Sequence, residues 1–134
     1  MNKDEVGRTG ECLAAEYLGQ LGYEILVRNW RDASGQRRVS GERYNRGELD
    51  IVALDGKTLV GVEVKTRSTE AYGHPAIALT PQKVARLRRL LGHWISAQRL
   101  TGPHFRDIRV DAVAIVLNPT GSGGPEVTHY RGIS

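Results

Sequence analysis

Short apolar runs stand on both sides of Asp55-Gly56. They lie within residues 47–54 and 59–67, and the second run is almost wholly apolar apart from Glu63 and Lys65, which indicates burial. Asp-Gly readily adopts the positive φ angles of a tight hairpin turn. The pattern therefore predicts two adjacent antiparallel strands within Gly47–Arg67, joined by an exposed turn.

Helical patterns precede and follow this hairpin. The first runs from about Asp4 to Leu21 and ends at Gly22, a residue typical of the position after a helix. The second begins at Thr80-Pro81, an N-cap followed by Pro at the first helical position, and runs to about Arg99. We expect the second helix to bury a stripe made of Val84, Leu87, Leu91, Trp94 and Ile95.

Three further strands complete the expected α/β fold. They are Tyr23–Trp30, Ile108–Leu117 and a short edge strand, Val127–Tyr130. Within the second of these, Arg109 and Asp111 share one face, and we expect them to pair with each other or to support a site from behind.

Size and composition narrow the class of protein. The 134 residues suit a single domain. The segment at about 32–46 has almost no apolar residue, so we expect a basic loop or a long hairpin tip there. The single cysteine, Cys12, rules out an internal disulfide and a Cys-rich zinc site. The charged N-terminus is unlike a signal peptide, and no apolar run approaches the roughly twenty residues that span a bilayer. We expect a soluble, cytoplasmic protein.

Charged residues occupy both hairpin strands where a purely structural strand would carry Val or Ile. Because side chains alternate across a strand, Glu63 and Lys65 should share one face of the second strand. In the first strand, alternation predicts one face with Glu48, Asp50 and Val52 and the other with Leu49, Ile51 and Ala53. Burying such charges costs on the order of several kcal/mol unless they are paired or bind a metal.

Two interpretations remain open for these charges. One is a buried ion pair between an acid and Lys65. The other is a divalent-metal site, in which Asp50 and Glu63 offer oxygen ligands and Lys65 faces an anionic substrate. Spacing does not decide, since an acid-x-Lys triplet arises by chance roughly once in a chain of this size. A second triplet, Asp55-Gly56-Lys57, indeed lies in the predicted turn.

Glu11 lies on the small-residue face of the first helix, together with Gly7, Ala14, Ala15 and Leu18. If the helix begins near Thr9, Glu11 is a first-turn carboxylate that the helix dipole favours. If it begins near Asp4, Glu11 is in mid-helix and needs a partner. We interpret it as a third carboxylate near the metal.

Basic residues gather in two regions of a chain with a net charge of +4. No acid stands between Glu70 and Asp107, where the cations are Lys83, Arg86, Arg88, Arg89, Arg99 and Arg106. The other cluster is Arg28, Arg31, Arg37, Arg38, Arg43 and Arg46. One-signed regions favour a polyanionic partner, most simply nucleic-acid phosphate, and the alternative is an Arg-rich solubility surface.

Two individual residues have simpler assignments. Lys83 lies in the first turn of the second helix, where a helix N-terminus favours phosphate. His74, beside Pro75, is more simply an exposed loop residue than a general base.

Taken together, these residues resemble the YraN-type, endonuclease-like family of small bacterial proteins. More distantly, the chain is similar to archaeal Holliday-junction resolvases, within the PD-(D/E)XK nuclease superfamily. The resemblance covers roughly residues 7–117. It is carried by Gly7-Arg8-x-Gly10-Glu11, Gly22-Tyr23-x-Ile25-Leu26-x-Arg28-Asn29, Gly47-Glu48-Leu49-Asp50, Val62-Glu63-Val64-Lys65-x-Arg67, Tyr72-Gly73-x-Pro75 leading to Lys83, and Arg109-Val110-Asp111.

The resemblance implies a restriction-endonuclease-like core, a mixed sheet flanked by helices. It implies that Asp50 and Glu63 ligate Mg²⁺, with Mn²⁺ as a substitute, that Glu11 joins the same centre, and that Lys65 positions or activates the attacking water. The expected function is DNA endonuclease activity, with branched DNA and a two-fold dimer suggested by the resolvases alone. Phosphate contacts would come from Lys83, Arg67, Arg8 and Arg46. The competing expectations are a DNA-binding module without catalysis and a protein whose basic face meets an acidic protein.

Overall fold

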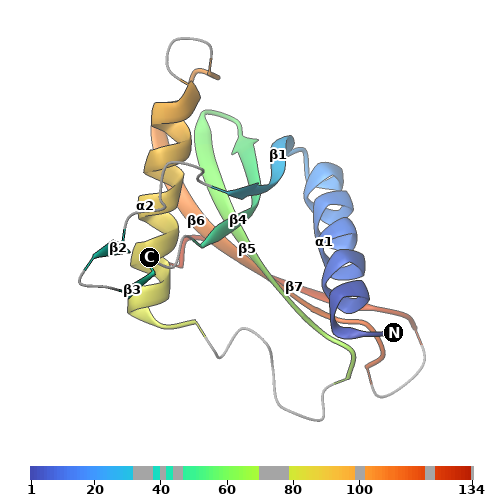
Figure 1. Cartoon of the computed structure of the whole chain (residues 1–134). Helices are drawn as coiled ribbons and strands as arrows, with labels where there is room; N and C mark the ends of the chain where they lie inside the picture. Colours follow the sequence, from blue (N-terminus) through green and yellow to red (C-terminus); the bar gives the residue numbers. More distant parts are fainter. Residues whose placement is uncertain are drawn as a thin grey trace.

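A five-stranded mixed sheet lies between two helices in the computed structural model (Figure 1). The structure describes residues 1–31, 38–39, 42–43, 47–69, 79–98, 102–119 and 123–133, with only the backbone at 38–39 and 42–43. The sheet order is β1-β4-β5-β6-β7, in which β5 and β6 are parallel and the other neighbours antiparallel. The elements are α1 Lys3–Gln20, β1 Glu24–Arg31, β4 Glu48–Asp55, β5 Thr58–Arg67, α2 Pro81–Gln98, β6 Asp107–Val116 and β7 Glu126–Tyr130. This is the expected α/β fold, a mixed sheet flanked by helices and compatible with a restriction-endonuclease-like core.

The segment between β1 and β4 contains a second, two-stranded sheet. Its antiparallel strands are β2 (Arg38–Val39) and β3 (Glu42–Arg43), which agrees with the hairpin tip predicted there. The rest of the basic segment at 32–46, including Arg46, lies outside the described residues. His74 also lies outside them.

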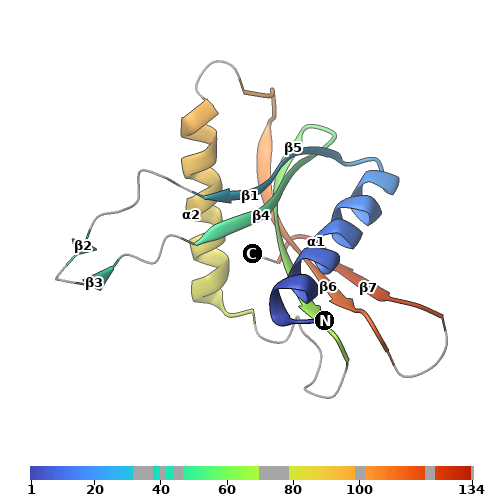
Figure 2. The same ribbon diagram turned by 45° about the vertical axis from the view of Figure 1, so that its right-hand side comes forward.

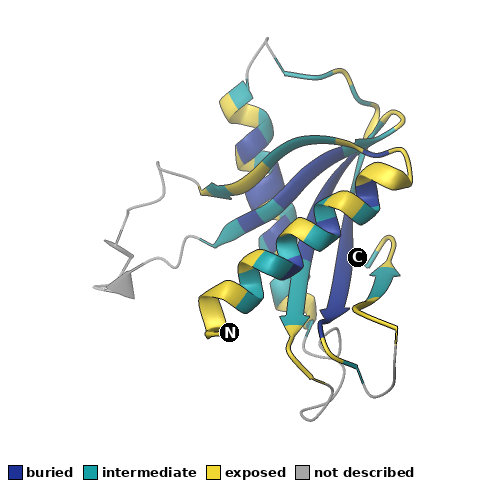
Figure 3. Cartoon of the chain, turned by 90° about the vertical axis from the view of Figure 1, so that its right-hand side faces the viewer, coloured by how far each residue is buried: buried dark blue, intermediate teal, exposed yellow. Residues whose placement is uncertain are grey.

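The two helices cover opposite faces of the large sheet (Figures 1 and 2). Parallel neighbours need a crossover connection, and α2 supplies the one between β5 and β6. The α2 face buries Leu49, Val52, Leu59, Leu87, Leu90, Leu91, Trp94 and Val110. The α1 face buries Ala14, Leu18, Tyr23, Ile51, Ala53, Val60, Val62, Val113, Ile115 and Leu117. Figure 3 shows the central strands buried and the outer side of α1 exposed.

Local capping sets the helix ends close to the predicted positions. The side chain of Asn2 accepts a hydrogen bond from the Glu5 backbone N–H at 2.9 Å, and Gly22 has a φ of 95° just after α1. At the start of α2, Thr80 Oγ1 accepts from the Lys83 N–H at 3.2 Å. The predicted stripe of α2 is buried apart from Ile95, which is half-buried, and Leu90 joins it. Because α1 begins at Lys3, Glu11 lies in mid-helix, which excludes the first-turn interpretation of its charge.

The turn of the hairpin is displaced by one residue from its predicted place. Asp55 pairs with Thr58, so the two turn residues are Gly56 and Lys57. Among the described turn residues only Gly56, with a φ of 60°, is left-handed, and the expectation of positive φ at Asp55 was wrong. A type II′ hairpin turn needs positive φ only at its first central residue, which Gly56 supplies, so Asp55 remains in the strand.

One predicted face of β4 is also wrong. Leu49 was expected beside Ile51 and Ala53, yet it packs with Val52 on the α2 face, while Ile51 and Ala53 face α1. The alternation therefore fails at Asp50. In the β1–β4 register Asn29 stands opposite Asp50, between the pairs Arg28↔Ile51 and Trp30↔Leu49, and it has a φ of 55°. A left-handed residue within a strand interrupts the pleat, which explains why the faces shift here.

The strands β4 and β5 separate at the same place. Their pairing extends from the turn only to Ile51↔Val62, after which β4 continues along β1 and β5 along β6. The Val64 N–H, which has no β4 backbone partner there, donates to Asp50 Oδ2 at 2.8 Å. We call this separation between Asp50 and Glu63 the fork. It allows side chains from both faces of the sheet to approach one another.

Gly10 sets how closely α1 approaches β5. A Cβ at Gly10 would lie 1.8 Å from Thr66 Oγ1, whereas a Cβ at Gly7 would have nothing within 4 Å. We expect Gly10→Ala to lower the free energy of unfolding by about 1–3 kcal/mol through overpacking. The matched change Gly7→Ala should raise it by roughly 0.5–1 kcal/mol, because Gly is a poor helix former. Urea denaturation measures both, and a gain at both positions would contradict the close helix–strand contact.

Candidate metal centre

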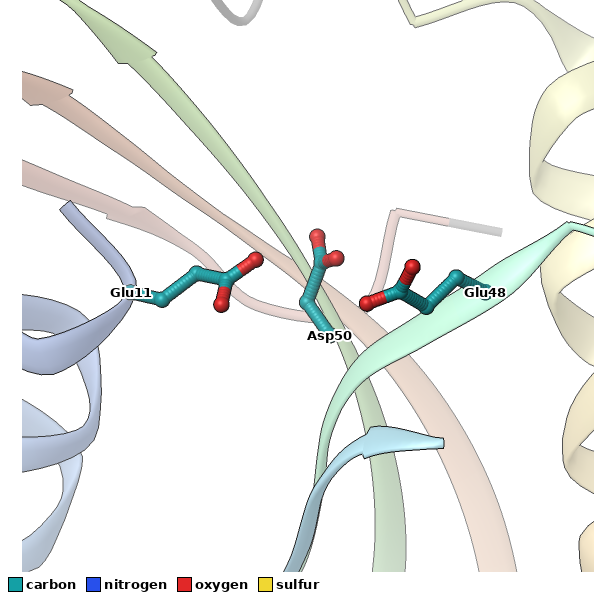
Figure 4. Close-up of side chains that lie close together, drawn as sticks. All are labelled: Glu11, Glu48 and Asp50. Carbon is teal, nitrogen blue, oxygen red and sulfur yellow. The ribbon is translucent and has the colours of Figure 1, made fainter. Parts of the chain in front are cut away.

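Three carboxylates converge at the fork. Glu11 extends from α1, and Glu48 and Asp50 extend from β4, with one oxygen of each within 4.8 Å of the others (Figure 4). All three residues are half-buried. The structure thus brings together Glu11 and Asp50, two of the three predicted ligands. The third member, Glu48, was missed as a ligand, although its predicted place on the same strand face as Asp50 was available in the sequence.

Glu63 lies beside this trio but has different partners. Its Oε1 is 3.8 Å from Lys65 Nζ and 3.5 Å from Lys83 Nζ. The residue is buried, with a relative exposure of 8%. Glu63 and Lys65 do share one face of β5, as predicted, and Lys83 reaches them from the first turn of α2. The ion-pair interpretation therefore describes Glu63, whereas the described residues give Asp50 no lysine or arginine within ion-pair distance.

The electrostatics of Asp50 reflect its crowded surroundings. Burial and, after it, the negative charge of Glu63 raise the pKa of Asp50 to about 8, while the hydrogen bond from the Val64 N–H acts to lower it. Burial also raises the pKa of Glu11, against which a hydrogen bond from the Asn29 side chain acts. Several carboxylates thus share a small space in which their common charge is unfavourable. A hard divalent cation with oxygen ligands would relieve that repulsion, so the donor set fits Mg²⁺ or Mn²⁺.

The two lysines form the cationic side of the fork. The neighbouring Lys83 and then burial lower the pKa of Lys65, while the charges of Glu63 and Asp50 act to raise it. Among the described residues, Glu63 is the carboxylate that forms an ion pair with both ammonium groups. Two neighbouring ammonium groups with one shared carboxylate leave an excess of positive charge, which suits an anion such as phosphate.

The remaining predicted phosphate contacts are less closely tied to the fork. Arg8 on α1 and Arg67 at the end of β5 are exposed, and Arg46 lies outside the described residues. Arg31, itself largely exposed, donates from Nε to Glu48 Oε2 at 3.1 Å. Glu48 therefore has one arginine partner that competes with any cation for its charge.

A separate polar network surrounds Asp111 on the α1 face. Arg109 Nε donates to Asp111 Oδ1 at 2.8 Å, which confirms the predicted pairing. The other oxygen, Oδ2, lies 2.8 Å from His129 Nε2 and accepts from the Tyr23 hydroxyl at 3.2 Å. Arg109 Nη2 also donates to Asp55 Oδ2 at 2.9 Å. The network joins β6, β7, the residue before β1 and the last residue of β4, and a role in supporting the fork remains a prediction.

The fold and the fork define a class: α/β proteins with a carboxylate cluster where two strands of a mixed sheet separate. Within that class, the chain belongs to the uncharacterised protein family UPF0102, which it matches over residues 10–115. It is 47% identical over 131 residues to a UPF0102 protein of Leifsonia xyli, covering 98% of this chain and 97% of that one.

Other relatives carry the same family name. A UPF0102 protein of Beutenbergia cavernae is 44% identical over 131 residues, which cover 98% of this chain and 97% of the relative. One of Mycobacterium tuberculosis is 42% identical over 136 aligned positions, covering 99% and 94%. The family match includes every residue of the fork, from Glu11 to Lys83. None of the helices in the described residues is long and apolar enough to cross a membrane.

Proposed function

We propose that this protein is a metal-dependent nuclease of the PD-(D/E)XK type that hydrolyses phosphodiester bonds in DNA. The observation that carries the proposal is the fork itself. Acids from α1 and β4 converge on one side, and Lys65 and Lys83 stand beside Glu63 on the other. A centre that pairs hard oxygen ligands with neighbouring ammonium groups suits a cation bound next to a phosphate.

Each residue of the fork has a proposed role. Glu11, Glu48 and Asp50 would hold the Mg²⁺, and Glu63 would join them on exchanging its lysine partners for the ion. A bound Mg²⁺ supplies a Lewis acid that lowers the pKa of water and neutralises the phosphate. Lys65 would orient the attacking water or stabilise the charge that develops on the phosphate. Lys83, with Arg67 and Arg8, would hold the flanking phosphates.

The Lys65→Ala variant tests this assignment against a matched lysine. We expect Lys65→Ala to lower the rate of DNA cleavage in Mg²⁺ by about 10²- to 10³-fold, a typical loss when one charge-stabilising group is removed. The control is Lys57→Ala, because Lys57 is exposed in the turn of the same hairpin and belongs to the other acid-x-Lys triplet. Equal rates for the two variants on linear and four-way-junction DNA would overturn the role of Lys65. Absence of cleavage by the wild type would overturn nuclease activity.

A second candidate function is a DNA-binding module without catalysis. It is favoured by Glu63, whose charge is already balanced by two lysines without any ion. Affinity for DNA measured in Mg²⁺ and in EDTA separates the two functions, because a module should bind equally in both. A steep fall of affinity with added salt would indicate phosphate contacts, and a flat response would point to a protein partner.

A further inference from the structure

Asn29 combines two properties that no other described residue of β1 has. Its φ of 55° is the only left-handed value among the described residues other than glycine. Its side chain also lies beside the carboxyl group of Glu11 on α1 and acts to lower the pKa of that carboxyl. The residue is exposed, so no core packing requires it.

The backbone of Asn29 acts on β4. In the strand register it stands opposite Asp50, the position at which the alternation of β4 faces fails. The same position marks the end of the pairing between β4 and β5, where Asp50 accepts the Val64 N–H at 2.8 Å. The left-handed residue, the shift of faces and the fork therefore coincide.

The side chain of Asn29 acts on α1. Glycine would be the ordinary residue for this backbone conformation, but it has no side chain that reaches Glu11. Asn tolerates the left-handed region better than most other residues and also carries an amide donor. It can therefore meet both requirements at one position.

We propose that Asn29 is a positioning residue of the fork: its left-handed backbone directs Asp50 into the gap between β4 and β5, and its amide holds Glu11 toward Asp50. The inference rests on the proposed function, since it assigns Asn29 to the assembly of the metal ligands. Asn29 itself does not touch the ion, and its effect is exerted through Glu11 and Asp50.

Two substitutions separate the backbone from the side chain. Asn29→Gly keeps the left-handed backbone at no steric cost and removes the amide. We therefore expect an unchanged or higher urea midpoint. Mn²⁺ binding should become about 10- to 100-fold weaker, the usual cost of losing a group that orients a ligand. Asn29→Ala removes both, so it should lower the urea midpoint and weaken Mn²⁺ binding at least as much. Calorimetric titration with Mn²⁺ and urea denaturation measure the two effects. The matched control is Glu24→Ala, an exposed β1 residue that pairs with Leu54 at the far end of the strand, and it should bind Mn²⁺ as the wild type does.

The outcomes discriminate between the two proposals. If Asn29→Gly binds Mn²⁺ as tightly as wild type, the positioning role is wrong and the metal centre stands. If Asn29→Gly and Glu24→Ala weaken Mn²⁺ binding equally, the role is wrong as well. If the wild type binds no Mn²⁺ and gains no stability from it, both the metal centre and the role of Asn29 are wrong.

Discussion

Asp50→Asn should abolish Mg²⁺-dependent DNA cleavage while making the metal-free protein more stable than wild type at pH 8. Asp50 is the central carboxylate of the trio, and an amide is a poor ligand for a cation that requires charge. The loss of cleavage should be at least about 10³-fold, the scale on which removal of a central electrostatic group acts. The fold should persist because the Asn oxygen can still accept the Val64 N–H. Gel assays of cleavage by the purified variant check the first part.

The pH dependence of stability checks the second part. Burial raises the pKa of Asp50 to about 8, so the folded chain binds this proton more tightly than the unfolded chain, whose carboxyl has a pKa of about 4. Wild-type stability should therefore fall as pH rises through this window in EDTA. Asn is neutral throughout, so the advantage of the variant should grow from pH 5 to pH 8, by on the order of a few kcal/mol. Urea denaturation in EDTA at several pH values measures it.

Asp55→Asn is the matched control on the same strand. Burial acts to raise the pKa of Asp55, but the hydrogen bonds from Arg109 and Arg131 prevail and lower it. Its neutral replacement should therefore destabilise the protein at pH 8 and leave cleavage intact. Adding Mn²⁺ at pH 8 should raise the stability of Asp55→Asn and wild type, but not of Asp50→Asn, because only a bound ion favours the folded state. Cleavage by Asp50→Asn at the wild-type rate would refute the metal centre.

Asp111→Ala should cause the largest loss of stability, about 3–5 kcal/mol in the free energy of unfolding, because it breaks a buried ion pair by removing one partner. Asp111 is fully buried, and its removal deprives Arg109 Nε, His129 Nε2 and the Gly132 N–H of this shared acceptor. Burial acts to raise the pKa of Asp111, but the hydrogen bond from Arg109 and then that from the Gly132 N–H lower it below its usual range. The stability it contributes is therefore present above about pH 4, the unfolded value, and is lost as pH falls through the folded pKa.

The neighbouring acid Asp107 provides the comparison. It lies on the same strand, is exposed and accepts one hydrogen bond, from Thr58 Oγ1 at 2.7 Å. Asp107→Ala should cost less than about 1 kcal/mol, as expected for one exposed hydrogen bond. Urea denaturation at pH 7 ranks the two variants. Similar losses would show that the Asp111 network is not a special source of stability.

The elements of this fold could be predicted because their determinants are local. The Thr80 cap, the Gly22 that ends the first helix and the apolar periods are all visible in the sequence, whereas the Asn2 cap was not predicted. The site could be predicted only in part. Nothing in the alternation pattern shows that Asn29 is left-handed, so Leu49 was placed on the wrong face. The approach of Lys83 to Glu63 likewise depends on how a whole helix docks, which spacing along the chain does not encode.

Because α1 and α2 cover opposite faces of the sheet, the charged residues of the fork come together only when both helices have docked. Glu11 arrives with the first helix and Lys83 with the second, so a hairpin alone, however well formed, holds only part of the constellation. An ion bound at the fork would therefore stabilise the whole fold against unfolding rather than one local segment. A chain interrupted before residue 80, still lacking its second layer, has no means of placing the second ammonium beside Glu63.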